Sequence, residues 1–184
     1  PVAHSFPTRR SSDLAAAWKA AKLGSSVLVV SGQFFFSDEV SAKARYWLDA
    51  DAAPRSDFAK ALLAAQGEDR PELAPARYKR SIEDLLVGAG AAFHYCTQPA
   101  GVLVDGAGGV CGAVLANKAG VQAVVAKVVI DATPTASLAR MAGAEMTPWD
   151  VREVTVSRVL YGRSVPGGRR IGKFCEVSAT AAMP

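Results

Sequence analysis

The chain has 184 residues, of which 50% are hydrophobic, 21% charged and 8% aromatic, a length that suits one ordinary domain or one domain and the start of a second. The formal charge of +4 is spread along the chain, with no basic run of the kind that marks a nucleic-acid site or a polybasic membrane site. No run of about 18 apolar residues occurs, which excludes a transmembrane helix.

The cysteines and histidines form no metal-binding pattern. Three cysteines and two histidines lie far apart in the sequence, so we expect no metal site. An odd, sparse set of cysteines is typical of reduced thiols, which favours a cytoplasmic location.

Residues 1–14 differ from the rest of the chain. They show no apolar periodicity, and residues 4–14 (HSFPTRRSSDL) resemble the translation of a sequencing-adapter tail. We expect this segment to be an artefact, with a genuine disordered tail as the alternative; it lacks the apolar core of a signal peptide. On this interpretation the natural protein begins upstream of Ala15.

The pattern that follows is typical of a nucleotide-binding α/β domain. Residues 15–23 are rich in alanine and favour a helix, which Gly24 ends. Residues 26–30 (SVLVV) are wholly apolar, as in a central parallel strand that is covered on both faces. In a dinucleotide fold a strand and a GxGxxG turn would precede this helix, but no GxGxxG occurs in the chain.

Three helices and a second parallel strand are predicted next. One helix spans residues 38–51, with Val40, Ala44 and Trp47 on one face. The other elements are short helices or strands bounded by proline, glycine or polar residues: helices at 57–66 and 75–88, and a strand at 92–96.

The period of the apolar pattern then changes from helix to strand. Residues 102–104 and 110–116 predict a hairpin around a glycine-rich turn, and residues 121–125 add a third antiparallel strand. This three-stranded meander is followed by a buried strand at 127–131.

Residues 135–142 favour a helix that still belongs to the first unit, and the last part of the chain predicts a second unit. In that part, residues 151–160 and 171–177 favour strands. We place the boundary between the units near residues 143–148.

The order of these elements resembles the FAD-binding domain of glutathione-reductase-type flavoproteins, within the broad family of FAD-dependent oxidoreductases that includes fumarate-reductase-like proteins. The resemblance is carried by residues 75–86 (PARYKRSIEDLL), residues 88–90 (GAG) and residues 128–133 (VVIDAT). The family hallmark is Asp-Ala-Thr-Gly, and here Pro134 stands in place of the glycine.

The resemblance implies an α/β fold with two domains. It predicts a Rossmann-like FAD/NAD(P)-binding domain with a three-stranded β-meander over residues 15–146, lacking its first strand and GxGxxG loop. Residues 147–184 would begin a truncated substrate domain. The whole protein would be an FAD-dependent oxidoreductase acting on a small-molecule substrate, with this chain binding the ADP part of FAD. Because strand and loop are expected to be missing, we expect this chain to be inactive and to hold FAD unstably, and we name no catalytic residue.

Two residues at the end of the strand 26–30 are candidate cofactor ligands. The family usually places an acid here to accept hydrogen bonds from both ribose hydroxyls, whereas Ser31, followed by Gly32, offers only neutral hydrogen bonds. A nearby acid, Asp38 or Glu39, could take that role; a simple turn at Ser31 is the alternative.

Five further residues are candidate cofactor ligands by the same resemblance. The backbone at Gln98 and Pro99 would contact the edge of the adenine, with an ordinary loop as the alternative. Ala132, Thr133 and Pro134 would lie beside the pyrophosphate, where Pro134 removes one backbone donor. A plain strand-to-helix turn is the alternative for these three.

Two other functions remain open. One is a non-catalytic α/β nucleotide-binding or scaffold module, which Ser31 and Pro134 favour. The other is an NAD(P)-dependent domain, against which the meander argues, since such domains rarely carry one at this place.

Overall fold

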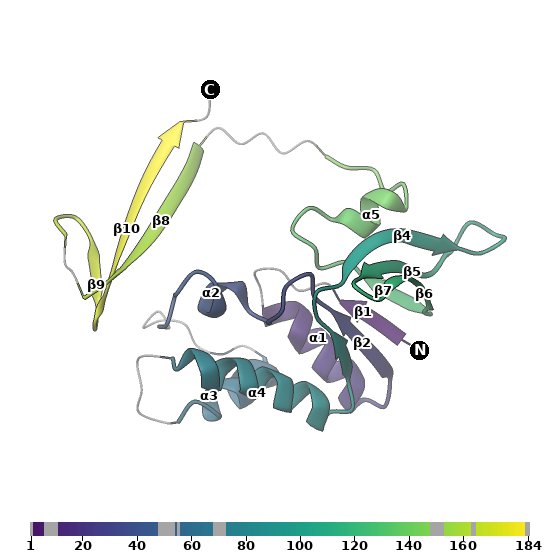
Figure 1. Cartoon of the computed structure of the whole chain (residues 1–184), viewed down its shortest axis with the longest axis horizontal. Coiled ribbons are helices and arrows are strands. Elements are labelled where there is room, and N and C mark those ends of the chain that lie inside the picture. Colours follow the sequence, from purple (N-terminus) through teal and green to yellow (C-terminus); the bar gives the residue numbers. More distant parts are fainter. Residues whose placement is uncertain are drawn as a thin grey trace.

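A four-stranded parallel sheet with the strand order β3-β2-β1-β7 lies at the centre of the chain. The computed structural model describes residues 2–5, 11–47, 54, 56–67, 73–147, 153–162 and 165–182. The strands of this sheet are β1 (Val2–Ser5), β2 (Ser26–Val30), β3 (Ala92–His94) and β7 (Val128–Ile130). Because they are parallel, their carboxyl ends meet at one edge of the sheet (Figure 1).

β1 lies between β2 and β7 in the sheet. The sequence instead predicted that residues 1–14 form no part of the domain and that the domain lacks its first strand. Val2 pairs with Ser26 of β2, and Ser5 pairs with Ile130 of β7. The facing backbone groups of β2 and β7 need hydrogen-bond partners when they are buried, and a four-residue strand supplies them. The pairing is made by backbone, so it needs no strong apolar pattern in β1.

Helix α1 (Ser11–Lys22) begins four residues earlier than predicted and ends one residue earlier than predicted. Gly24 has a φ of 84°, the left-handed conformation that glycine adopts without strain. Its N–H donates to the carbonyl of Ala21 at 2.9 Å, and the N–H of Ser25 donates to the carbonyl of Ala20 at 3.0 Å. This pair of bonds is a Schellman motif, which turns the chain directly into β2.

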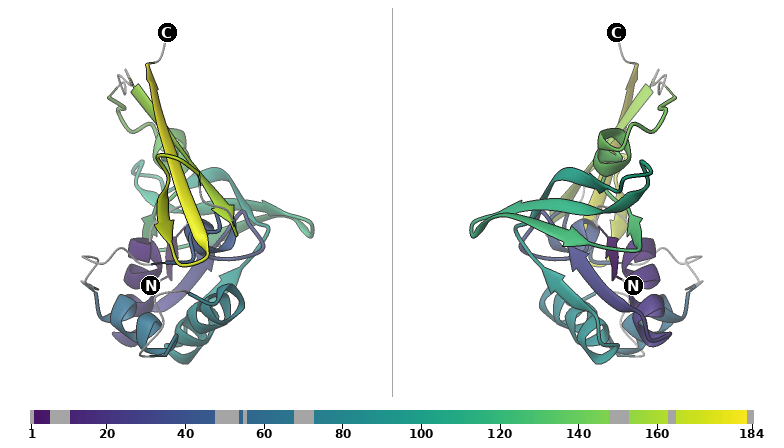
Figure 2. Two further views of the ribbon diagram at one scale, coloured as in Figure 1. Left: turned by 90° about the vertical axis from the view of Figure 1, so that its left-hand side faces the viewer. Right: turned by 90° about the vertical axis from the view of Figure 1, so that its right-hand side faces the viewer.

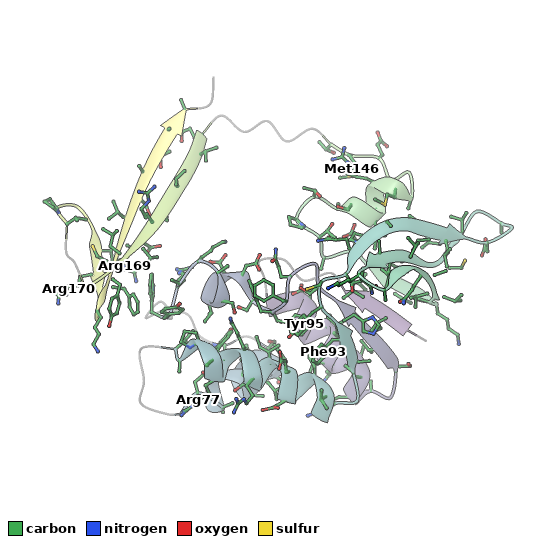
Figure 3. All side chains as sticks on the ribbon, in the orientation of Figure 1. Arg77, Phe93, Tyr95, Met146, Arg169 and Arg170 are labelled. Carbon is green, nitrogen blue, oxygen red and sulfur yellow. The ribbon has the colours of Figure 1, made fainter. Side chains whose placement is uncertain are left out.

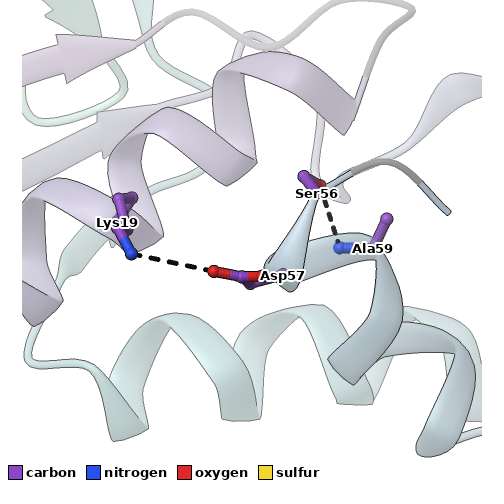
Figure 4. Close-up of polar contacts among 4 residues, drawn as sticks. All are labelled: Lys19, Ser56, Asp57 and Ala59. Carbon is purple, nitrogen blue, oxygen red and sulfur yellow. Dashed lines mark hydrogen bonds and ion pairs between the residues drawn. The ribbon is translucent and has the colours of Figure 1, made fainter.

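Helices α3 (Asp57–Ala64) and α4 (Pro75–Gly88) lie with α1 on one face of the sheet (Figure 1). The bounds of α4 agree with the prediction, and α3 ends two residues before its predicted end. Figure 4 shows the start of α3, where the Ser56 hydroxyl accepts a hydrogen bond from the Ala59 N–H at 3.1 Å. Lys19 and Asp57 form an exposed ion pair at 3.7 Å between α1 and α3, a kind that adds little stability.

The predicted helix at 38–51 is wrong beyond its first turn. Helix α2 covers only Asp38–Ser41, and Ala44 has a φ of 55°, which a continuing helix does not allow. The rings of Tyr46 and Trp47 instead contact Phe174, with centroids 5.4 and 5.9 Å apart. This tertiary contact outweighs the local helix propensity. Residues 48–51 of the prediction lie outside the described residues.

The opposite face of the sheet is covered by the predicted three-stranded meander and by α5 (Ser137–Met141). The meander strands are β4 (Gln98–Val104), β5 (Val110–Asn117) and β6 (Gly120–Val125), paired antiparallel in that order. Val27 and Val29 of β2 belong to the helix-side core, and Val30 belongs to the meander-side core with Leu115 and Leu138. This alternation buries β2 on both faces, as its wholly apolar sequence predicts.

A second, antiparallel sheet has the strand order β8-β10-β9 and lies in the part of the chain for which a second unit was predicted. Its strands are β8 (Glu153–Tyr161), β9 (Arg169–Ile171) and β10 (Phe174–Ala182). β8 and β10 run side by side as a long ribbon in all views (Figures 1 and 2). The predicted boundary at 143–148 falls between α5 and β8, and residue 148 itself lies outside the described residues. None of the described helices is long and apolar enough to cross a membrane.

Substitution of Leu86 by alanine is expected to destabilise the helix-side core by about 2–5 kcal/mol, because Leu86 is 0% exposed and the shorter side chain loses buried contacts and leaves a cavity. The matched control is Val87→Ala on the next residue of α4, which is 62% exposed and should change the free energy of unfolding by well under about 1 kcal/mol. Urea unfolding followed by circular dichroism measures both. Equal effects of the two substitutions would contradict the core assigned to α4.

Candidate functional site

The candidate site is the edge of the parallel sheet at which the strands end. In open α/β sheets, ligands bind outside the carboxyl ends of the strands. The segments that reach this edge follow β2, β3 and β7, and the first turn of α1 lies there as well, because α1 runs from this edge back to the start of β2.

Ser31 follows β2 and is buried. Its N–H donates to the carbonyl of His94 at 2.8 Å, and its own carbonyl accepts from the N–H of Thr97 at 2.9 Å. Its hydroxyl donates to the carbonyl of Phe35 at 3.3 Å and accepts from the N–H of Gln33 at 3.2 Å. The serine therefore fixes the turn after β2 and joins it to the end of β3, with its hydroxyl already used inside the turn.

Gly32 and Gln98 are brought together although they lie far apart in the sequence. A Cβ atom at position 32 would lie 2.8 Å from Cδ of Gln98, so the glutamine amide occupies space that only glycine leaves open. Gln98 is exposed, and its amide can both donate and accept hydrogen bonds. Pro99 follows it in β4 and is half-buried. The structure thus joins two of the three predicted groups of cofactor ligands.

Thr97 is a buried residue of this junction that the sequence did not reveal. Its hydroxyl donates to the carbonyl of Tyr95 at 2.9 Å and accepts from the Asn117 side chain at 3.3 Å. It therefore ties the end of β3 to the last residue of β5. Only its position between two predicted strands could have drawn attention to it.

The end of β3 is also fixed to α4. The Tyr95 hydroxyl donates to the Glu83 carboxylate at 2.6 Å, and the rings of Phe93 and Tyr95, both labelled in Figure 3, lie 5.1 Å apart. Burial, and then the hydrogen bond and negative charge of Glu83, raise the pKa of Tyr95. Tyr95 therefore stays protonated and serves as a donor that positions the strand.

The third predicted group, Ala132, Thr133 and Pro134, lies on the other side of β1. β7 pairs with β1, so one strand separates this turn from the end of β2. Asp131 accepts hydrogen bonds from the N–H groups of Thr133 at 2.8 Å and Ala139 at 2.9 Å. These bonds set the start of α5, and Pro134 itself is exposed.

The first turn of α5 borders a shallow recess. Its volume is about 330 Å³, and it is lined by polar and apolar side chains of the turn and helix: Thr135, Ser137, Arg140 and Met141. The hydroxyl of Thr133 accepts from the Ser137 N–H at 2.7 Å and so holds the helix against the end of β7.

Of the two acids proposed to replace a ribose-binding carboxylate, Glu39 bonds to Lys43 one helical turn later. Asp38 is the first residue of α2. The Glu39 carboxylate therefore has a partner in the segment that directly follows α2.

Asp13 is the anomaly of the site. It lies in the first turn of α1 and is only 7% exposed, and within the described residues neither of its carboxylate oxygens has a hydrogen-bond partner. Burial raises its pKa to about 6, although the nearby N–H groups of Leu14 and Asp13 act in the opposite direction. Asp13 belongs to residues 1–14, which were predicted to lie outside the domain, and it was therefore not predicted as a site residue. Ser-Ser-Asp before an apolar run is a signal for a helix start and could have found it.

The described part of the chain holds no group of three or more His, Cys, Asp and Glu side chains that could bind a metal ion. Its cysteines are unpaired thiols: Cys96 is exposed, Cys111 half-buried and Cys175 buried.

A family model for FAD-dependent oxidoreductases matches residues 11–155. The chain belongs to the FAD-dependent oxidoreductase family. No curated protein matches it.

Solved structures agree with this family in fold. THI4 from Thermovibrio ammonificans is 20% identical with a TM-score of 0.56, over 78% of this chain and 63% of that one. A geranylgeranyl bacteriochlorophyll reductase-like protein from Thermoplasma acidophilum is 14% identical with a TM-score of 0.67, over 98% of this chain and 56% of that one. The anhydrotetracycline hydroxylase OxyS from Streptomyces rimosus is 11% identical with a TM-score of 0.67, over 97% of this chain and 44% of that one. The chain therefore spans about half the length of these structures.

FAD is the cofactor of this family, and the two ends of its ADP part fit the chain differently. At the adenosine end, the exposed side chain of Gln98 lies against Gly32, and its amide suits a neutral, hydrogen-bonding group. At the diphosphate end, the buried carboxylate of Asp13 stands in the first turn of α1, where an anion would have to bind. The adenosine end fits, and the diphosphate end does not.

The pKa of Asp13 predicts a pH-dependent stability. A carboxyl group with a pKa near 3.8 in the unfolded chain and about 6 in the folded protein binds more protons in the folded state between these pH values. The contribution of Asp13 to the free energy of unfolding is therefore most favourable below about pH 4 and is lost as the pH rises through about 6. The loss should be on the order of 2–3 kcal/mol. Asp13→Asn removes this loss, so the variant should be more stable than the wild type at pH 7.5 and should gain nothing at pH 4. Urea unfolding of both proteins at the two pH values measures it; an unchanged difference between them would show that Asp13 does not titrate in this way.

Proposed function

We propose that this chain supplies the adenosine-binding part of the FAD site in an FAD-dependent oxidoreductase that acts on a small-molecule substrate. The observation that carries the proposal is the contact between Gly32 and Gln98 at the carboxyl edge of the parallel sheet, beside β1. The match to the family model over residues 11–155 supports the same assignment.

The residues at this edge have two different roles, one structural and one in binding the ligand. Ser31 and Thr97 hold the ends of β2 and β3 together through the bonds described above. Gln98 offers its amide to a ribose hydroxyl or to the edge of the adenine, and the backbone at Pro99 continues that edge. The two residues that directly follow β2, Ser31 and Gly32, are neutral, so recognition of the ribose there is by neutral groups.

In the whole protein, bound FAD would carry out hydride or electron transfer. The β8-β10-β9 sheet would begin the substrate domain, as proposed for residues 147–184. The unpaired cysteines of the described residues support a cytoplasmic location.

One observation favours a second function, a non-catalytic nucleotide-binding or scaffold module. The Ser31 hydroxyl is used within its own turn instead of facing a ligand. The two functions differ in whether adenosine binds at Gly32.

Calorimetric titration with adenosine tests the proposal. Gly32→Ala should weaken adenosine binding by at least about tenfold, because the new Cβ displaces the Gln98 amide from its place. Gly106→Ala is the matched control, since a Cβ there meets nothing within 4 Å and the residue lies in the meander turn. If the wild type binds no adenosine, or if both variants bind it as the wild type does, the proposed site is wrong and the scaffold function is favoured.

A further inference from the structure

We propose that the exposed ring of Phe34 stacks on the base of a bound nucleoside, so that this site recognises purines by their flat face more than by the groups on their edge. The inference rests on the proposed adenosine site at Gly32 and Gln98. It adds a residue that was not predicted as part of the site, and it names the class of ligand, a purine nucleoside.

The first step is the place of Phe34 in the turn that follows β2. The carbonyl of Gln33 accepts a hydrogen bond from the N–H of Cys96 at 3.0 Å. One residue before Gln33, Gly32 lies against the side chain of Gln98, which comes two residues after that cysteine. Phe34 therefore directly follows the stretch of chain that contacts Gln98, and both residues belong to one junction at the carboxyl edge of the sheet.

The three phenylalanines of this turn have different surroundings. The ring of Phe36 is 1% exposed and lies 4.8 Å from the ring of Tyr95. Phe35 is half-buried, and the Nζ of Lys79 lies 4.9 Å from the centre of its ring. Phe34 is 72% exposed. Packing within the chain therefore accounts for two of the three rings and not for the third.

The ring of Phe34 has a face available to a ligand. It meets the ring of Phe35 at an interplanar angle of 87°, with the two centroids 4.9 Å apart. In such an edge-to-face pair one ring directs its edge at the face of the other, so Phe35 covers at most one face of Phe34. The same contact restricts the motion of the Phe34 ring, which lowers the entropy lost when a ligand stacks on it.

A purine base can meet this ring with a face of its own. Stacking on an aromatic side chain requires only a flat π-face, which every base has, so it holds bases without distinguishing among them. The edge of the base would meet the amide of Gln98, which can donate and accept hydrogen bonds and so suits either an amino or a carbonyl group. Adenosine and inosine differ in that group, and we expect the site to bind both.

Calorimetric titrations with adenosine and inosine test the inference on the wild type, Phe34→Ala, Phe34→Tyr and Tyr161→Ala. Phe34→Ala removes the ring and should weaken the binding of both nucleosides by the same factor, at least about fivefold. Phe34→Tyr keeps the ring face and should bind both within about twofold of the wild type. Tyr161→Ala removes a ring that is 69% exposed in the second sheet, and it should behave as the wild type.

The outcomes separate this inference from the proposed function. Adenosine binding that is unchanged in Phe34→Ala, or that is weakened as much by Phe34→Tyr or Tyr161→Ala, would overturn the stacking and leave the adenosine site in place. A wild type that binds adenosine but not inosine would overturn recognition by the ring face. If the wild type binds no adenosine, the proposed function is wrong and this inference with it. Far-UV circular dichroism of each variant shows that it is folded.

Discussion

The pairing of β1 with two neighbours is the interaction on which the arrangement of the site depends. β1 bonds to β2 through one side of its backbone and to β7 through the other, and it thereby sets the distance between the turns that follow those strands. A parallel strand in this place also requires a crossover to β2, which α1 provides. The same pairing therefore fixes the carboxyl edge and brings the start of α1 to it.

Burial of β2 on both faces links this sheet to the rest of the chain. Val27 and Val29 pack against the helices, while Val30 packs against the meander and α5. The turn after β2 can then be rigid, because the strand before it is held from both sides. The hydrogen bonds of Ser31 then fix the turn at the candidate site. They join it to Phe35, Gln33, His94 and Thr97.

Local sequence signals predicted the elements whose first and last residues are marked in the sequence. They failed where contacts between distant residues determine the structure. β2 and α4 were predicted to the residue, since an apolar run or a Pro and Gly pair bounds each. The helix at 38–51 failed because Tyr46 and Trp47 pack on Phe174 of the second sheet. β1 has no apolar alternation, so its pairing with β2 and β7 cannot be predicted from its own four residues. Ser31, Gly32 and Gln98 were named individually, but the contact of Gly32 with Gln98 depends on the β2–β3 pairing.

The two ends of the candidate nucleotide site differ in charge. The adenosine end consists of neutral groups that satisfy one another, so its form depends little on pH or salt. The diphosphate end depends on the start of α1, where Asp13 places a buried negative charge. Asp13 is costly to bury without a partner, and its carboxylate is tolerated there because the helix N-terminus opposes its charge. The same partial charge offsets the carboxylate of Asp13 only in part, so the start of α1 depends on pH in a way that the neutral end of the site does not.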